Sequence, residues 1–253
     1  IPIGIIGIIY ESRPNVTSDV AALCFKSGNC VVLKGGSEAF NSNLILSKLF
    51  RKSLKKNKVD ENFVQFINIK NRSVVNFLLT KMSKYINVII PRGGKSLVKK
   101  VQNLSNIPTI SHLEGVCHTY VDKDASPNIA NKVVYNAKLR NTAICGATET
   151  ILLHEKIVKK IGNQILTSLE KDGCKIIADN KLRKLYNGKV QKASLKDWAK
   201  EYLSPIVSVK IVKNLNESIK HINKFGTMHT DCIITQNKKT AKKFMDEVKS
   251  SIA

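Results

Sequence analysis

Short apolar runs alternate along this chain with segments in which apolar residues recur at helical spacing. The runs are continuous, which is typical of strands buried on both faces of a parallel sheet. The predicted strands cover residues 3–10, 30–34, 64–68, 86–90, 107–112, 117–122, 148–154, 174–178, 206–212 and 231–235. The predicted helices cover residues 17–27, 39–55, 71–83, 95–104, 125–139, 155–171, 214–225 and 238–249. This alternation predicts α/β layers around mainly parallel sheets.

Chain length and the number of strands favour two domains. Strands in this number fit two sheets of about five strands each better than one large sheet. A glycine near position 115 separates two short strand-like runs, so we expect one domain over residues 1–116 and another over 117–253. Thr17 is predicted to cap the first helix and Asn214 a later one, because short polar side chains satisfy free backbone N–H groups there. The chain begins without Met and stops where another strand begins, so we expect a part of a longer protein.

The formal net charge of +23 comes mostly from lysines that are spread over the predicted helices. Nucleic-acid binders usually concentrate their charge and add stacking or bidentate groups. Few aromatic residues accompany these lysines, so we interpret them as a solvated surface and expect no nucleic-acid partner. A basic nucleic-acid-binding module is kept as a rival function. No apolar run reaches the roughly 18 residues that span a bilayer, so no membrane association is expected.

Six cysteines are present, without a CxxC pair and without the density of a disulfide-rich protein. Several lie inside apolar runs, where a cysteine behaves as a small hydrophobic residue. This pattern indicates a reducing cytoplasm. Cys and His residues do not cluster along the chain, so no zinc or other metal site is predicted.

Three predicted strands of the first half end in polar corners, two of which contain paired glycines. The first corner covers residues 11–17, the second covers 34–38, and the third covers 91–96. We expect them at the carboxyl ends of alternate strands of one sheet, where α/β sheets bind ligands. Glycines let backbone N–H groups approach an anion, although each corner is also compatible with an ordinary β–α turn. Neither a GxGxxG pattern nor a complete Walker loop is present, which disfavours a P-loop NTPase.

Cys145 lies in a different setting from the other cysteines. The pattern predicts a helix that ends near Leu139, then an irregular stretch of small and polar residues before the next strand. Cys145 is therefore expected on a loop, with Gly146 behind it. A reactive thiolate needs access and a lowered pKa, to which neighbouring N–H groups and Lys138 or Arg140 would contribute. A catalytic nucleophile and an incidental cysteine both stay open on this pattern alone.

Seven motifs follow one another along nearly the whole chain. They are IPIGIIGIIYESRPNVT (1–17), KGGSE (34–38), IPRGG (90–94), CHTYVD (117–122), NAK (136–138), CGATET (145–150) and GTMHTD (226–231). In sequence and order they resemble the gamma-glutamyl phosphate reductase family of the aldehyde dehydrogenase superfamily. The resemblance implies an aldehyde dehydrogenase-like α/β fold, with a Rossmann-like cofactor domain followed by a second α/β catalytic domain. Members of the family are longer at both ends.

The resemblance also implies the cofactor site. Residues 1–116 would bind NADPH, with Lys34, Ser37 and Glu38 near the adenosine ribose and its 2′-phosphate. The residues that it places along the cofactor are Lys34, Gly35, Gly36, Ser37, Glu38, Gly93 and Gly94.

The residues that the resemblance implies for catalysis are Cys145, Asn15, Arg13 and Glu114. Cys145 matches the family nucleophile, and Arg13 or Asn15 would stabilise an oxyanion. Glu114 lies where many aldehyde dehydrogenases carry a general base, but a positioning or turn role is the alternative. His118 and His229 match family motifs, either as proton carriers or as structural hydrogen-bonding residues.

The implied reaction is the NADPH-dependent reduction of L-glutamate 5-phosphate to L-glutamate 5-semialdehyde. It releases phosphate, passes through a cysteine thioester and belongs to L-proline biosynthesis. The resemblance further implies a homo-oligomer when full length, working with glutamate 5-kinase in the cytoplasm. An ordinary aldehyde dehydrogenase is a close rival, because it shares the fold and the cysteine. A non-catalytic fragment is a third possibility.

Overall fold

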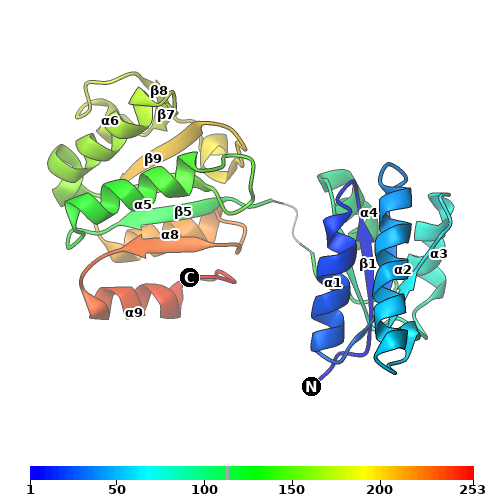
Figure 1. The fold of residues 1–253 in the computed structure, drawn as a ribbon. Coiled ribbons are helices and arrows are strands. Elements are labelled where there is room, and N and C mark those ends of the chain that lie inside the picture. The colour runs from blue at the N-terminus through cyan, green and yellow to red at the C-terminus, as the bar shows by residue number, and fades with distance from the viewer. Residues whose placement is uncertain (112–113) are drawn as a thin grey trace. The chain divides into compact units, whose positions relative to one another are not determined.

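The computed structural model describes residues 1–111 and 114–253. The chain divides into two compact units, unit 1 (Ile1–Leu113) and unit 2 (Glu114–Ala253). This division falls a few residues before the domain boundary expected between 116 and 117. In each unit a parallel sheet is flanked by helices (Figure 1). None of the helices described is both long and apolar enough to cross a membrane.

Unit 1 is built on a four-stranded parallel sheet with the strand order β3-β2-β1-β4. Its strands are β1 (Ile5–Tyr10), β2 (Cys30–Gly35), β3 (Val64–Phe66) and β4 (Val88–Arg92). Its helices are α1 (Asn15–Lys26), α2 (Phe40–Lys56), α3 (Ser73–Lys81) and α4 (Lys95–Leu104), with a 3₁₀ turn, η1 (Glu61–Phe63).

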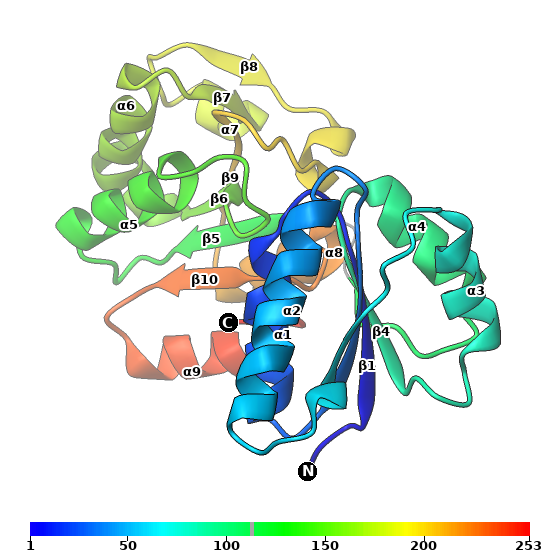
Figure 2. The ribbon, with the colours of Figure 1, turned by 45° about the vertical axis from the view of Figure 1, so that its right-hand side comes forward.

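Successive residues of β1 pack on opposite faces of this sheet. Ile8 joins a hydrophobic cluster with Ala21 of α1 and Leu54 of α2, whereas Ile9 joins a second cluster with Leu79 of α3 and Val101 of α4. Figure 2 shows α1 and α2 on one side of β1 and β4, and α3 and α4 on the other. Because both faces are covered, the strand sequence is continuously apolar, as expected for a parallel sheet.

Unit 2 is built on a six-stranded parallel sheet with the strand order β10-β5-β6-β9-β7-β8. Its strands are β5 (Cys117–Val121), β6 (Thr148–His154), β7 (Lys175–Ala178), β8 (Val190–Lys192), β9 (Ile206–Val212) and β10 (Asp231–Ile234). Its α-helices are α5 (Pro127–Leu139), α6 (Asn163–Lys171), α7 (Asn180–Arg183), α8 (Leu215–Phe225) and α9 (Lys238–Glu247). Its 3₁₀ and π turns are η2 (Glu155–Ile157), η3 (Val158–Gly162) and η4 (Leu195–Ala199).

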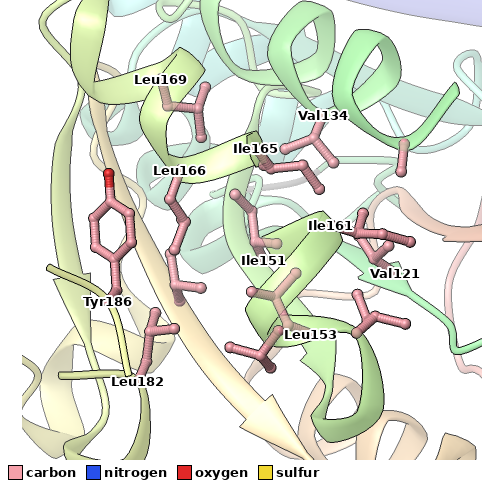
Figure 3. Packing of buried hydrophobic residues seen from close by; sticks show 14 of the residues in the cluster. Val121, Val134, Ile151, Leu153, Ile161, Ile165, Leu166, Leu169, Leu182 and Tyr186 are labelled. Carbon is pink, nitrogen blue, oxygen red and sulfur yellow. The ribbon is translucent and has the colours of Figure 1, made fainter. Parts of the chain in front are cut away.

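The larger hydrophobic cluster of unit 2 packs α5 and α6 against one face of the sheet. Ile151 and Leu153 of β6 point into it, toward Val134 of α5 and Ile165 of α6 (Figure 3). Leu152, between them in sequence, joins a smaller cluster with Ile222 of α8 on the opposite face. The sheet of unit 2 is therefore also covered on both sides.

Most predicted elements are confirmed to within a few residues, and two predicted elements are wrong. Residues 107–111 contain only an isolated bridge between Thr109 and Ile89, and residue 112 of that predicted strand lies outside the described residues. The helix expected over 155–171 begins with η2 and η3 before α6. The two predicted sheets are present, with four and six strands where about five each were expected. The short elements β8 and α7 were not predicted.

The predicted cap of the first helix is also wrong. Thr17 lies inside α1, which begins at Asn15, and its hydroxyl contacts the Tyr10 hydroxyl (2.6 Å) and the Asn43 side chain (3.1 Å). Asn214 does cap α8, where its side chain accepts a hydrogen bond from the Glu217 N–H at 3.0 Å.

Candidate functional site

The three corners of unit 1 lie at one edge of its sheet. They follow β1, β2 and β4, which are adjacent strands rather than the alternate strands expected. The Glu11 N–H donates to the Arg92 carbonyl at 3.0 Å, which ties the first corner to the third. All three therefore meet at the carboxyl ends of parallel strands, the edge at which α/β sheets bind ligands.

A cavity of about 310 Å³ opens at this edge, and we call it the corner cavity. It is lined by the second corner, by Tyr10, Glu11 and Ser12, and by side chains from α4 and from the segment before α3. Lys34 lines it although only 4% of the residue is exposed, and its ammonium donates to the Gly35 carbonyl at 2.8 Å. Burial lowers the pKa of Lys34, and the carboxylate of Glu38 opposes this shift.

Gly36 keeps the wall of the corner cavity open. A Cβ atom at this position would lie 2.6 Å from a carboxylate oxygen of Glu38 and 3.4 Å from the Ser12 nitrogen. The absence of a side chain therefore leaves the backbone accessible to a ligand. A glycine-bearing corner beside a buried lysine fits an anionic ligand such as a dinucleotide.

Glu11 occupies the N-terminus of α4, and the sequence patterns did not single it out. Its carboxylate accepts a hydrogen bond from the Gly94 N–H at 2.8 Å, and a Cβ atom on Gly93 would lie 2.6 Å from it. The anion position expected of this glycine pair is thus filled by a side chain of the protein. Gly93 and Gly94 do not line the corner cavity, although Ser96 and Leu97 do.

Arg13 and Asn15 lie on a different surface of unit 1. They line a second cavity of about 800 Å³, together with apolar residues of β1 and α1. The Asn15 amide donates to the Asp19 carboxylate at 3.0 Å. The structure therefore does not bring these two residues into the corner cavity.

Cys145 lies in a turn between α5 and β6, as predicted, and is half-buried. Gly146 behind it is exposed, and a Cβ atom there would meet nothing within 4 Å. On the other side Gly115 approaches so closely that a Cβ atom would lie 2.0 Å from the Cys145 carbonyl oxygen. Glu114 directly precedes Gly115, so its backbone lies beside the same turn.

Cys117 holds the Cys145 turn from the adjacent strand β5, and no sequence pattern around it indicated this contact. Its thiol donates to the Cys145 carbonyl at 3.2 Å and lies 3.7 Å from Nδ1 of His229. Burial, assisted by the negative charge of Asp231, raises the pKa of Cys117 to about 12. Cys117 is therefore a neutral donor at pH 7. Only the motif over residues 117–122 could have drawn attention to it.

The residues around Cys145 gather at the amino ends of three neighbouring strands. Cys145 precedes β6, Glu114 precedes β5 and His229 precedes β10, and these strands are adjacent in the sheet. The Val116 N–H donates to the Thr227 hydroxyl at 3.0 Å, which ties the segment before β5 to the one before β10.

Lys138, expected to contribute positive charge near the Cys145 thiolate, is paired with another side chain. Its buried ammonium forms an ion pair of 2.6 Å with Glu149, whose other oxygen accepts from the Leu203 N–H at 3.2 Å. Burial raises the pKa of Glu149 despite the opposing effect of Lys138. Arg140, at the C-terminus of α5, is exposed.

His118 is buried within the sheet of unit 2. Its backbone N–H and its Nδ1 lie 2.7 Å and 2.9 Å from the same oxygen of Asp231. The other oxygen of Asp231 accepts from the Ser250 hydroxyl. These contacts favour the structural alternative for His118. Among the residues described, no group of three or more His, Cys, Asp or Glu side chains could hold a metal ion.

Comparison with known proteins places these features in a family. A profile of the aldehyde dehydrogenase family matches residues 1–175. The gamma-glutamyl phosphate reductase of Magnetococcus marinus is 44% identical over 253 residues, which is 99% of this chain and 60% of that protein. The enzyme of that name from Rhodospirillum rubrum is 44% identical over 252 residues, covering 100% of this chain and 58% of that protein. The chain thus spans about three fifths of the length of these relatives.

Solved structures give the same result. The crystal structure of gamma-glutamyl phosphate reductase from Thermotoga maritima matches with a TM-score of 0.91 and 40% identity, covering 99% of this chain and 60% of that one. An acetylating aldehyde dehydrogenase from Geobacillus thermoglucosidasius matches with a TM-score of 0.72 at 18% identity, which shows the shared fold. The predicted aldehyde dehydrogenase-like fold and the resemblance to gamma-glutamyl phosphate reductases are both confirmed. The profile match over more than half of the residues shows that this chain belongs to the aldehyde dehydrogenase family.

Proposed function

We propose that this chain is part of a gamma-glutamyl phosphate reductase of L-proline biosynthesis. Such an enzyme reduces L-glutamate 5-phosphate with NADPH to L-glutamate 5-semialdehyde and phosphate. The observation that carries the proposal is the accessible turn of Cys145, in a chain 44% identical along almost its whole length to relatives of that name. For the full-length protein the proposal includes a homo-oligomer in the cytoplasm that works with glutamate 5-kinase.

Cys145 is the proposed nucleophile. Its thiolate attacks the acyl carbon of the substrate, the bond from that carbon to the phosphate oxygen breaks, and phosphate leaves. A thioester on Cys145 results, and covalent catalysis thereby divides one difficult displacement into two easier steps. When the aldehyde forms, the carbon–sulfur bond breaks and the thiolate is restored.

The surroundings of Cys145 supply position and charge stabilisation. The backbone N–H of Cys145, with Arg13 or Asn15 as a side-chain donor, would stabilise the oxyanion that develops on the acyl oxygen. The neutral thiol of Cys117 holds the Cys145 carbonyl, so that the turn keeps its conformation. Glu114 stays a candidate for catalysis or for positioning, since an acyl phosphate does not require an activated water for this step.

NADPH supplies the hydride when it is bound, and the corner cavity is its proposed site. Lys34, Ser37 and Glu38 would lie near the adenosine ribose, and Gly35 and Gly36 would let the backbone approach the cofactor. The fit of this cavity to an anionic ligand supports the assignment.

The nucleophile is tested by Cys145→Ser in the full-length protein. Semialdehyde formation should fall by roughly 10⁴-fold or more, because an alcohol is a poor substitute for a thiolate. NADPH binding, measured by calorimetry, should be unchanged. Cys30→Ser, at a half-buried cysteine of unit 1, is the matched control and should keep its activity. Near-normal turnover of Cys145→Ser would eliminate the assignment.

The substrate is tested in the reverse direction. Oxidation of glutamate semialdehyde should require inorganic phosphate and yield the acyl phosphate. Oxidation at an equal rate without phosphate would favour the rival reading as an ordinary aldehyde dehydrogenase.

A further inference from the structure

Two basic side chains, Lys70 and Arg72, reach the corner cavity from the segment between β3 and α3. The motifs of the sequence do not include them. Arg72 lies 3.7 Å from a carboxylate oxygen of Glu38, which belongs to the second corner. The Lys70 ammonium lies 5.0 Å from the centre of the Phe40 ring, at the first residue of α2. Both cations therefore stand at the end of the cavity formed by the second corner.

The ion pair between Arg72 and Glu38 is loosely held. The side chains are 85% and 54% exposed, and such exposed pairs contribute little to stability. Arg72 can therefore exchange Glu38 for a ligand at small cost. A guanidinium binds phosphate through two parallel hydrogen bonds, which makes it well suited to such an exchange.

Charge balance at this end of the cavity decides what it can accept. Two carboxylates, those of Glu11 and Glu38, line the cavity. The Glu11 carboxylate already accepts a hydrogen bond from the Gly94 N–H, so Glu38 is the one available to a ligand. A carboxylate alone would accept hydrogen bonds from the two ribose hydroxyls of NADH and would repel the 2′-phosphate of NADPH. Lys70 and Arg72 add two positive charges beside it, and the buried Lys34 adds a third. The net sign is positive and favours the phosphate.

We propose that Arg72, assisted by Lys70, binds the 2′-phosphate and sets the preference of this site for NADPH over NADH. The inference rests on the proposed function, because it concerns the same cofactor site. Arg72 and Lys70 lie outside the Lys34–Glu38 corner. They favour NADPH, whereas the Glu38 carboxylate by itself would favour NADH.

Binding measurements test the inference without turnover. Dissociation constants of the purified protein are measured by calorimetry for NADPH, NADH and adenosine 2′,5′-bisphosphate at one fixed salt concentration. Arg72→Ala should weaken NADPH and the bisphosphate at least about tenfold, since a hydrogen-bonded charge pair is lost. NADH should change less than about twofold. Lys70→Ala should shift the same ratio in the same direction by a smaller factor.

Matched variants separate this role from a general loss of charge. Lys99→Ala removes an exposed cation of α4 that does not line the cavity, and it should leave all three constants unchanged. Arg72→Lys should recover part of the NADPH affinity.

The outcomes separate this inference from the cofactor assignment itself. An unchanged ratio of NADPH to NADH affinity in Arg72→Ala, or an equal loss for both, would overturn the inference alone. Failure of the wild type to bind either dinucleotide would overturn the cofactor site, and this inference with it.

Discussion

Lys34 in unit 1 and Lys138 in unit 2 are both buried lysines, yet their ammonium groups have opposite surroundings. Lys138 is fully buried and paired at 2.6 Å with Glu149. Lys34 donates to a backbone carbonyl beside a cavity, and burial lowers its pKa. An incompletely paired buried charge is costly, and the Glu38 carboxylate offsets only part of this cost at Lys34. The anionic cofactor that we propose for the cavity would complete the pairing. The charge of Lys138 is thus neutralised by a side chain of unit 2, whereas the charge of Lys34 lies at the wall of a cavity.

The edges of the two sheets show the same contrast. In unit 1 the candidate residues stand at the carboxyl ends of the strands, in glycine-bearing corners that lead into helices. In unit 2 they stand at the amino ends, in turns fixed by contacts such as that from Cys117 to the Cys145 carbonyl. The first arrangement suits reversible binding, and the second suits a group that must be held in one position.

The contrast between the lysines predicts the largest effect. Lys138→Met leaves Glu149 buried and unpaired, which should lower the free energy of unfolding by about 3–5 kcal/mol. Lys34→Met should lower it by less than about 1 kcal/mol, because the lost hydrogen bond is offset by removal of a buried charge. It should instead weaken NADPH binding. Urea unfolding and calorimetry measure the two quantities.

Two results check the physical reason. The double variant Lys138→Met with Glu149→Leu should recover much of the stability, because neither charge is then left alone. Equal destabilisation by the two single lysine variants would break the comparison.

Acid sensitivity should lie in unit 2, through His221 of α8. Burial, with His118 and Lys210 nearby, lowers the pKa of His221 to about 3. Between pH 3 and 6.5 the unfolded chain holds a proton that the folded chain lacks, so stability falls as the pH falls through this window. The expected loss is a few kcal/mol. His221→Gln should flatten the dependence of the unfolding free energy on pH. The same pH dependence in the variant and in the wild type would contradict this account.

A smaller effect on stability is expected when a methyl group is added to either of the glycines beside Cys145. Gly115→Ala places a Cβ atom 2.0 Å from the Cys145 carbonyl oxygen, so backbone must move at a cost of about 1–3 kcal/mol. Gly146→Ala meets open space on the other side of Cys145 and should cost less than about 0.5 kcal/mol. Urea unfolding gives the stabilities, and the rate of iodoacetamide labelling reports the conformation of the turn. Similar values for the two variants would show that the turn is not held by Gly115.

Strongly periodic segments were predicted from the sequence, and weak ones were not. The bounds of α4, β6 and β9 are those expected, because each has a continuous apolar run or a complete helical stripe. The run at 107–112 also looks like a strand, but Pro108 removes a backbone donor and only Thr109 makes a bridge. The edge strand β8 has three partly polar residues and gives no signal.

In the candidate site, too, some residues could be predicted from the sequence and others could not. The loop of Cys145 was predictable from its neighbours, because the end of a helix and the start of a strand are local features. The contact of Glu11 with Gly94 joins residues 83 apart, and that of Cys117 with His229 joins residues 112 apart. No local pattern encodes such pairs, so Glu11 and Cys117 required the fold.

The order of strands in unit 2 has a consequence for synthesis on the ribosome. Strand β5 is made early, but one of its two neighbours is β10, and the bond from His118 to Asp231 spans 113 residues. At about 5–20 residues per second, the nascent β5 waits on the order of ten seconds for that partner. During this time the edge of β5 that later pairs with β10 has unpaired backbone groups. Shielding by chaperones should therefore matter more for unit 2 than for unit 1, whose central strand finds its last partner after 82 residues.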